Sequence, residues 1–391
     1  MLEKFELTQD QLEDIRDALR GRIQEGLAAS GREIKALPAF LPYPDPELKG
    51  TATVVDAGGT NMRAALVQLK GGGEVEVVAG PIKDSIPDGR EQRVTAEQFF
   101  QAQAELVRKL APPPKLPLGY CFSYPAETLP TKDARLLRWT KGVDIPGVEG
   151  TMVGARLQEA IRRAGLEPGP VSVMNDTVAS LLGGGVVHAR GQVPHYIGLI
   201  VGTGTNMAAL FSIDQISKVA AADWPADKKM CINLESGNFH PPHLTEWDDQ
   251  VDASSDQPGT QRFEKAVSGY YLPFLLEVLC PDLPGFDPRK GTQQLVALRE
   301  RGEGEAAEAA RLLLQRSADL VAAALVAVMD HYGPGDVGIL AEGSLIWGDP
   351  LYRDRVEATM ARLLKGERKA RIIEQRKDVN LIGAAGAALS G

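Results

Sequence analysis

One short pattern occurs twice in the sequence, each time between two apolar segments. The residues Gly-Thr-Asn-Met at 59–62 recur at 204–207, and alanines and a leucine follow both copies. The apolar stretches 51–56 and 196–201 precede them. Glycine between two apolar strands is typical of a tight β-hairpin. The offset of 145 residues is too long for a solenoid repeat. The pattern therefore predicts two related halves, each with one glycine-rich hairpin.

Apolar periodicity over the rest of the chain alternates between strand and helix, which is typical of an α/β protein. The predicted strands cover 51–56, 62–69, 75–78, 116–121, 171–174, 196–201, 207–211 and 337–341. The predicted helices cover 8–29, 96–110, 151–164, 259–279, 304–331, 350–364 and 380–390, with a further helix of small residues after Asp176. The proline-rich residues 38–46 are predicted to be a connector. At 391 residues, the chain has enough mass for two or three domains.

The two hairpins have the composition of phosphate-binding loops. Glycine lets backbone N–H groups approach an anion closely and point at it together. The relevant residues are Gly58, Gly59, Thr60, Asn61 and Arg63 in the first hairpin and Gly202, Thr203 and Gly204 in the second. Hydroxyl and amide donors and the arginine charge add to the backbone groups. Two such hairpins facing each other would clamp a polyphosphate; the alternative is that both are ordinary tight turns.

Two aspartates directly follow apolar strands. Asp56 precedes the first hairpin, where a carboxylate beside a phosphate loop is suited to holding Mg²⁺ through water. Asp176 follows the strand 171–174 and precedes a helix. It is either the N-cap of that helix or a general base that accepts a hydroxyl proton. The sequence leaves both readings of Asp176 open.

Composition and missing motifs exclude several other classes. The net charge of −9 argues against a nucleic-acid-binding protein that depends on general phosphate neutralisation. No apolar run approaches the ~20 residues of a membrane span, and three cysteines make no disulfide framework. P-loop, dinucleotide-binding, serine-hydrolase and zinc-protease motifs are absent. We therefore expect a soluble cytoplasmic enzyme without a nucleic-acid or membrane partner.

Several segments together resemble the hexokinase family, within the superfamily of actin, sugar kinases and heat-shock ATPases. They are the first hairpin at 54–63, a sugar signature at 118–125 with 137–142, a catalytic segment at 173–178, the second hairpin at 197–206, and the segments 231–235, 244–248 and 258–265. They stand in the family's order, and the resemblance runs from about residue 5 to the end of the chain. Other sugar-kinase branches share the hairpins but not the sugar signature.

The resemblance implies two actin-like (ribonuclease H-like) α/β domains with a cleft between them. The large domain would hold residues 1–49 and 175–378, and the small domain 50–174 and 379–391. The implied reaction transfers the γ-phosphoryl group of Mg·ATP to the 6-hydroxyl of a hexose and feeds glycolysis. Glucose is the leading substrate, with mannose and fructose as alternatives. The protein would act as a monomer or homodimer.

The resemblance also assigns roles to single residues. Asp176 is implied as the catalytic base, and Lys141 lies where it could also approach the transferring phosphoryl group. The residues implied to hydrogen-bond the sugar are Ser123, Thr140, Lys141, Asn175, Asp176, Asn206, Glu235 and Glu264. The turn Gly343-Ser344 is implied on the adenosine side of the nucleotide. Such side chains suit a hexose because its hydroxyls both donate and accept hydrogen bonds.

Two positions depart from the family pattern, and two other functions stay open. Ser236 stands where the family usually has tryptophan, and Glu342 stands where an aspartate usually precedes the Gly-Ser turn. One alternative is a sugar-sensing protein with a hexokinase fold and little turnover. The other is a nucleotide hydrolase of the actin or chaperone kind, against which the polar set at 123, 140, 141 and 235 argues.

Overall fold

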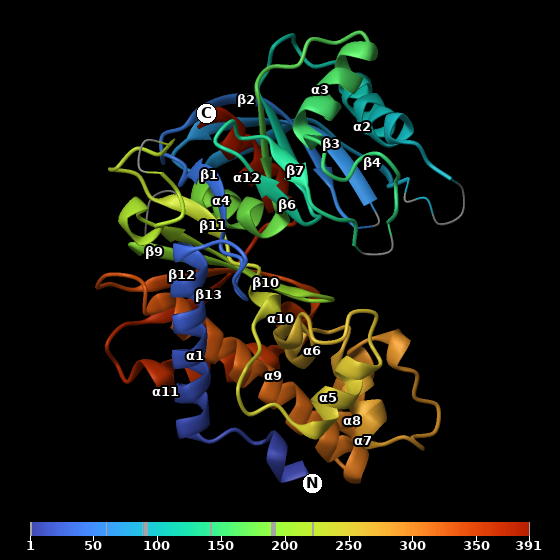
Figure 1. Cartoon of the computed structure of the whole chain (residues 1–391), viewed down its shortest axis with the longest axis vertical. Coiled ribbons are helices and arrows are strands. Elements are labelled where there is room, and N and C mark those ends of the chain that lie inside the picture. Colours follow the sequence, from blue (N-terminus) through green and yellow to red (C-terminus); the bar gives the residue numbers. More distant parts are fainter. Residues whose placement is uncertain are drawn as a thin grey trace.

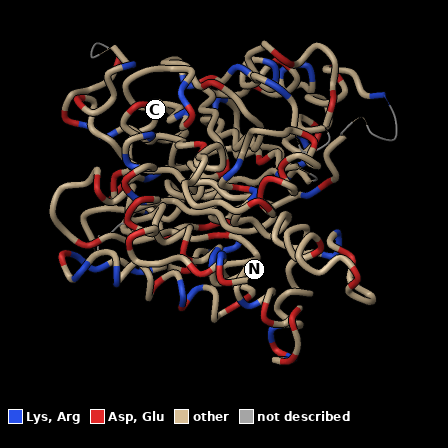
Figure 2. The backbone as a smooth tube through the Cα atoms, turned by 60° about the horizontal axis from the view of Figure 1, so that its bottom comes forward, with Lys and Arg blue, Asp and Glu red and all other residues tan. Residues whose placement is uncertain are grey.

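The computed structural model has two lobes, each built around one β-sheet (Figure 1). It describes residues 2–59, 61–87, 89, 93–140, 143–188, 193–220 and 223–390. The N-terminus lies at the far end of one lobe, and the last helix returns to the other (Figure 1). Acidic and basic residues are interspersed over both lobes (Figure 2).

The first lobe, here the five-stranded lobe, takes its sheet from the first half of the chain. Its strands in spatial order are β4 (Glu74–Ser85), β3 (Asn61–Gly71), β2 (Lys49–Ala57), β5 (Leu118–Phe122) and β8 (Val171–Met174). A separate ribbon pairs β6 (Ala126–Thr128) with β7 (Ala134–Leu136). Successive side chains on a strand point to opposite faces. Val55 accordingly joins the core under α2 (Ala96–Leu110) and α3 (Val153–Arg163), whereas Val54 packs with α12 (Val379–Leu389).

The second lobe, here the six-stranded lobe, holds most of the helices. Its strands in spatial order are β1 (Leu37–Pro42), β11 (Met230–Asn233), β10 (Thr205–Phe211), β9 (His195–Val201), β12 (Val337–Glu342) and β13 (Ala370–Glu374). Its helices are α1 (Gln9–Ala28), α5 (Glu246–Ala253), α6 (Arg262–Val267), α7 (Leu272–Leu279), α8 (Gln293–Arg301), α9 (Glu305–Met329), α10 (Ser344–Gly348) and α11 (Pro350–Leu364). One buried cluster joins α1, α7, α9 and α11 to the sheet.

The two sheets repeat one arrangement of strands. In the first, β4, β3 and β2 are antiparallel neighbours, and β5 and β8 follow in parallel to β2. In the second, β11, β10 and β9 are antiparallel neighbours, and β12 and β13 follow in parallel to β9. The glycine-rich hairpins occupy matching places, β2–β3 and β9–β10. The prediction of two related halves is therefore confirmed.

Helix α9 forms the centre of the six-stranded lobe. Among the described residues, α9 alone has the length and apolar composition that a membrane-crossing helix needs. The sequence pattern had predicted no such segment. Within its most apolar window, 94% of the residues are buried inside the protein. Its apolar character on all sides thus reflects packing by neighbouring helices and the sheet.

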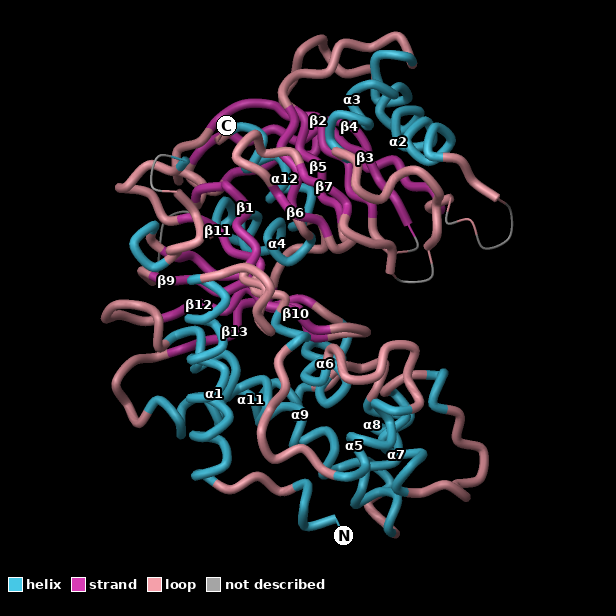
Figure 3. The backbone as a smooth tube through the Cα atoms, viewed as in Figure 1, coloured by secondary structure: helices cyan, strands magenta, loops and turns pink. Residues whose placement is uncertain are grey.

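Helices α4 (Asp176–Val187) and α12 cross between the two sheets (Figure 3). A Cβ atom built on Gly383 of α12 would lie 1.8 Å from the carbonyl oxygen of Ala179, and one built on Gly183 of α4 would lie 2.1 Å from that of Val379. Glycine at both positions lets the two backbones touch. The chain passes between the lobes after β1, through α4 after β8, and into α12 after β13, so two of these three links meet at the crossing.

Most predicted elements are present, and the two corrections have their cause in contacts with residues distant in sequence. Residues 259–279 form two helices, not one, because the break brings Gly269 against the second hairpin, where its N–H donates to the Gly202 carbonyl at 2.7 Å. Residues 38–46 were predicted to be a connector, but β1 pairs with β11 there. Proline is tolerated because β1 is an edge strand. The domain boundaries stay a prediction.

Candidate functional site

The first glycine-rich hairpin joins β2 to β3. The Gly58 N–H donates to the carbonyl of Asn61 at 2.9 Å, which closes the turn. The Tyr124 hydroxyl donates to the carbonyl of Gly58 at 2.8 Å. Gly59 lies at the tip and is half-buried, and Thr60 lies outside the described residues. The hairpin is confirmed and is held to the segment after β5; its contact with phosphate stays a prediction.

Asp56 lies in a row of side chains that crosses three strands on one face of the sheet. Arg63 on β3 and Cys121 on β5 are its register partners on either side. The Arg63 Nε atom donates to Asp56 Oδ2 at 2.7 Å, so the guanidinium predicted to meet phosphate is paired with a carboxylate here. Burial, followed by the charges of Asp56 and Asp176, raises the pKa of the Cys121 thiol well above its ordinary value. The thiol therefore stays protonated beside Asp56.

The second hairpin joins β9 to β10 and meets the Gly343-Ser344 turn. The Gly202 N–H donates to the Gly204 carbonyl at 2.9 Å, and Thr203 is exposed at the tip. Gly343 has φ +120°, and a Cβ atom there would lie 2.1 Å from the carbonyl oxygen of Val201. Only glycine fits so close to the hairpin. The predicted adenosine-side turn and the second predicted phosphate loop are thus neighbours.

Asp176 is the first residue of α4, at the junction of the lobes. The N-cap is Asn175, whose side-chain oxygen accepts from the Thr177 N–H at 2.9 Å. Asp176 Oδ1 accepts from the same N–H at 2.8 Å. Because Asn175 occupies the capping position, the N-cap reading of Asp176 is wrong. Its half-buried carboxylate faces the region of Cys121 and Glu342, whose titration it affects.

A chain of polar side chains lies beside the second hairpin. The Asn206 Nδ2 atom donates to Asn233 Oδ1 at 2.8 Å, and Asn233 Nδ2 donates to Glu235 Oε1 at 2.7 Å. The Ser236 N–H donates back to Asn206 Oδ1 at 3.2 Å. The sequence pattern identified the segment 231–235, which contains Asn233, but predicted no role for that residue. Its signal was a polar residue that ends an apolar strand, two positions before a predicted site residue.

Glu264 holds the second hairpin from the other side. Its Oε2 atom accepts from the Thr205 N–H at 3.0 Å. A Cβ atom on Gly204 would lie 2.8 Å from that oxygen, so the hairpin backbone passes close to the carboxylate. The predicted sugar residue Glu264 and the predicted phosphate residue Gly204 are therefore in contact.

The sugar signature supplies the five-stranded lobe's share of the predicted site. Ser123 follows β5 and is 6% exposed, and its N–H donates to the Ala57 carbonyl at 3.1 Å. Thr140 is half-buried and follows Trp139, whose ring packs edge-on against Tyr124 at 4.8 Å between centroids. Lys141 lies outside the described residues.

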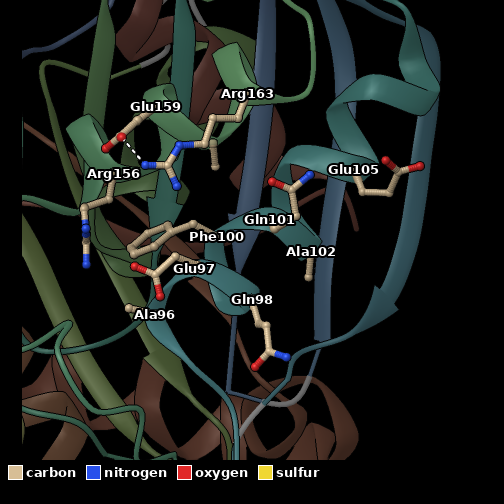
Figure 4. Close-up of a pocket in the computed structure, with 11 residues that line it drawn as sticks. Ala96, Glu97, Gln98, Phe100, Gln101, Ala102, Glu105, Arg156, Glu159 and Arg163 are labelled. Carbon is tan, nitrogen blue, oxygen red and sulfur yellow. Dashed lines mark hydrogen bonds and ion pairs between the residues drawn. The ribbon is translucent and has the colours of Figure 1, made fainter.

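Side chains from both lobes meet around a small cavity lined by Tyr124, Asn175 and Asn233. A larger groove, of about 530 Å³, lies elsewhere, between α2 and α3 on the five-stranded lobe. There Arg156 and Glu97 flank the Phe100 ring, and Arg163 pairs with Glu159 (Figure 4). The described residues contain no group of three His, Cys, Asp or Glu side chains placed to hold a metal ion.

The repeated sheets, the hairpin in each lobe and the helix-start carboxylate between them define a two-domain kinase fold of the actin-like class. A hexokinase family model matches residues 1–186, and a second matches 196–285 and 293–390. The chain belongs to the hexokinase family.

Relatives and solved structures agree with this assignment. The curated hexokinase of Schwanniomyces occidentalis is 33% identical over 287 residues, which cover 70% of this chain and 59% of that protein. Hexokinase-1 of Saccharomyces cerevisiae is 34% identical over 276 residues, which cover 67% of this chain and 56% of that protein. The structure of a Schistosoma mansoni hexokinase complexed with glucose matches with a TM-score of 0.80 and 26% identity, covering 100% of this chain and 97% of that one. The aligned part spans less than two thirds of the curated relatives' length.

Proposed function

We propose that this chain is an ATP-dependent hexokinase that transfers the γ-phosphoryl group of Mg·ATP to the 6-hydroxyl of a hexose. The observation that carries the proposal is the position of Asp176. It begins a helix at the junction of the lobes, and Asn175 takes the capping role, which leaves the Asp176 carboxylate to accept a proton. Glucose is the leading substrate, because the Schistosoma mansoni relative was solved with glucose. Mannose and fructose share most of the hydroxyls that such a pocket would bind.

The sugar would bind to the polar residues of both lobes. The Asn206–Asn233–Glu235 chain presents amides and a carboxylate, each held in place by its neighbour. A fixed donor and acceptor pattern suits a ring of hydroxyls. Glu264, Asn175, Ser123, Thr140 and Lys141 complete the proposed set. Their removal should weaken sugar binding more than nucleotide binding.

The two hairpins would bind the phosphates of ATP through backbone N–H groups. Asp56 fits a role in holding Mg²⁺ through water, since it presents hard oxygen ligands beside the first hairpin while Arg63 fixes its orientation. No cluster of protein ligands surrounds it among the described residues, which suits a cation held mainly by phosphate and water. Bound there, Mg²⁺ would offset the charge that develops on the phosphates.

In the proposed reaction, Asp176 accepts the proton of the sugar hydroxyl while that oxygen attacks the γ-phosphorus in line. The backbone N–H groups of the hairpins stabilise the charge on the phosphoryl oxygens. Closure of the lobes around α4 and α12 would exclude water, which otherwise competes as the acceptor. Most of the rate enhancement comes from positioning, and the proton transfer adds its own share.

The test is sugar-dependent release of ADP from Mg·ATP, with glucose, mannose, fructose, glucosamine and a blank without sugar. We expect fast turnover with glucose and a low blank. Asp176→Ala should lower kcat by ~10²–10⁴-fold, whereas the exposed Asp214→Ala serves as a matched control. No turnover from a folded protein that binds glucose would favour the sugar-sensing alternative, and a high blank would favour a nucleotide hydrolase.

We also propose a place in glycolysis, a cytoplasmic location and a monomeric or homodimeric state. These follow from the resemblance and the acidic composition of the chain. Sedimentation velocity at several protein concentrations decides the oligomeric state.

A further inference from the structure

A partly buried polar cluster lies one helical turn beyond Asp176 and has no role in the proposed reaction. Its centre is Glu342, the last residue of β12, which lies close enough to the Ser180 hydroxyl of α4 for that hydroxyl to affect its titration. Ser180 is fully buried and accepts from Gln375 Nε2 at 2.5 Å. Residues i and i+4 share a helix face, so Ser180 stands directly beyond Asp176. The cluster thus connects three parts of the chain: the Gly343-Ser344 turn, helix α4, which begins with Asp176, and the segment between β13 and α12 that contains Gln375.

The backbone holds Glu342 firmly against the second hairpin. Glu342 is the register partner of Ile200 in β9, and Gly343 follows it with its Cα against the carbonyl of Val201. A Cβ atom on Gly202 would lie 3.1 Å from the Ser344 nitrogen. Any movement of Glu342 would therefore move the hairpin proposed to bind the phosphates.

The charges around Glu342 disfavour a further negative charge. The charged groups that act on it are the carboxylates of Asp176 and Asp56 and the guanidinium of Arg63. Arg63 is already paired with Asp56 at 2.7 Å. One oxygen of Glu342, Oε1, is buried and has no hydrogen-bond partner among the described residues. A carboxylate left in that condition would be strongly destabilised, whereas a neutral carboxyl would not.

We propose that Glu342 works as a neutral acid and is a positioning residue for the nucleotide phosphates. A neutral carboxyl carries an O–H donor, whereas a carboxylate only accepts. Phosphate oxygens of ATP are acceptors, so the neutral form suits them and the ionised form repels them. This role rests on the proposed function, since it concerns the same phosphate site.

The expected effect of pH follows from the same surroundings. Burial raises the pKa of Glu342 above its ordinary value, and the negative charges of Asp176 and Asp56 add to that rise. The Ser180 hydroxyl, as a hydrogen-bond donor, and the positive charge of Arg63 oppose it. Below the raised pKa the residue is neutral and nucleotide binds well. As the pH rises through it, a negative charge appears and nucleotide affinity falls. A glutamine at this position carries no such charge at any pH.

The experiment measures the dissociation constant of Mg·AMPPNP by calorimetry on the folded full chain, beside the KM values for ATP and hexose. Glu342→Ala should weaken nucleotide binding about tenfold, the worth of one hydrogen bond, and leave the hexose KM unchanged. Glu342→Gln should rescue most of that loss and bind more tightly than the parent at alkaline pH. Ser180→Ala should leave nucleotide binding unchanged near neutral pH and keep it tight to a higher pH than in the parent, because Ser180 favours the ionised form of Glu342. The exposed Glu374→Gln on the neighbouring strand is the matched control.

Two results would overturn the proposal. Either Glu342→Gln binds as weakly as Glu342→Ala, which would make the charged form the working one, or the Glu342→Ala protein binds nucleotide as the parent does. If Glu342→Ala fails to fold, the pH comparison between Glu342→Gln and the parent decides. Because direct binding needs no sugar, a parent that phosphorylates no hexose would reject the proposed function and leave this test intact.

Discussion

Replacing Gly383 with alanine will force apart the two helices on which the lobes meet. The new Cβ atom would lie 1.8 Å from the Ala179 carbonyl oxygen of α4, against an ordinary contact of 3.4 Å or more. The helices must separate by about 1.6 Å there, and overpacking of this kind costs ~1–3 kcal/mol. Alanine also gains ~1 kcal/mol in helix propensity over glycine. The control Gly386→Ala has the same gain in helix propensity on the same helix. Its new Cβ atom would lie 3.0 Å from the nearest atom, a methyl carbon of Val186.

Urea denaturation of both variants isolates the cost of the crossing. We expect Gly383→Ala to be less stable than Gly386→Ala by ~1–3 kcal/mol. Because α4 begins with Asp176, a shift of about 1 Å should also lower kcat by up to ~10²-fold. A Gly383→Ala protein as stable and as active as Gly386→Ala would refute the reasoning, since the close approach of the two helices would then have no consequence.

Three further predictions follow from single contacts. Arg316→Ala removes one partner of the buried ion pair with Asp248, where the two side chains are 1% and 4% exposed, and should cost ~3–5 kcal/mol in urea denaturation. Burial acts to raise the pKa of Asp248, but Arg316 and hydrogen bonds lower it below its ordinary value overall. The ion pair therefore stabilises the fold at pH values above the ordinary aspartate pKa, and this stabilisation is lost as the pH falls through the lowered pKa. Asp248→Asn should make the free energy of unfolding depend less on pH in that acid range. Asn233→Ala breaks the links to Asn206 and Glu235, and should raise the hexose KM about tenfold or more with little change in the KM for ATP in steady-state assays.

The hairpins were predictable because their signals are local. Gly58 and Gly59 between two apolar strands define a turn from neighbouring residues alone, and the second copy at 202–204 repeats the signal. The same holds for strand 171–174 and helices 96–110 and 350–364, whose observed bounds equal the predicted ones. Local propensity and periodicity agree there with the tertiary environment.

Other features depended on residues distant in sequence. The break between α6 and α7 exists because Gly269 meets Gly202, some 67 positions earlier. Residues 38–42 form a strand because β11 offers an edge to pair with. The part played by Asn233 emerges only when β10 and β11 lie side by side. No pattern within a short window carries such information.

By itself, the sequence determined the α/β class, the two related halves, the positions of both glycine-rich hairpins and the family. All of these depend on local pattern and on motif order. Only the tertiary structure decided that Gly383 of α12 meets Ala179 of α4 and that the half-buried Glu342 lies near the carboxylates of Asp56 and Asp176. The physical reason is that hydrogen bonds and charge–charge interactions depend on distance in space, and these groups approach one another only after both sheets have formed and α4 and α12 have packed between them.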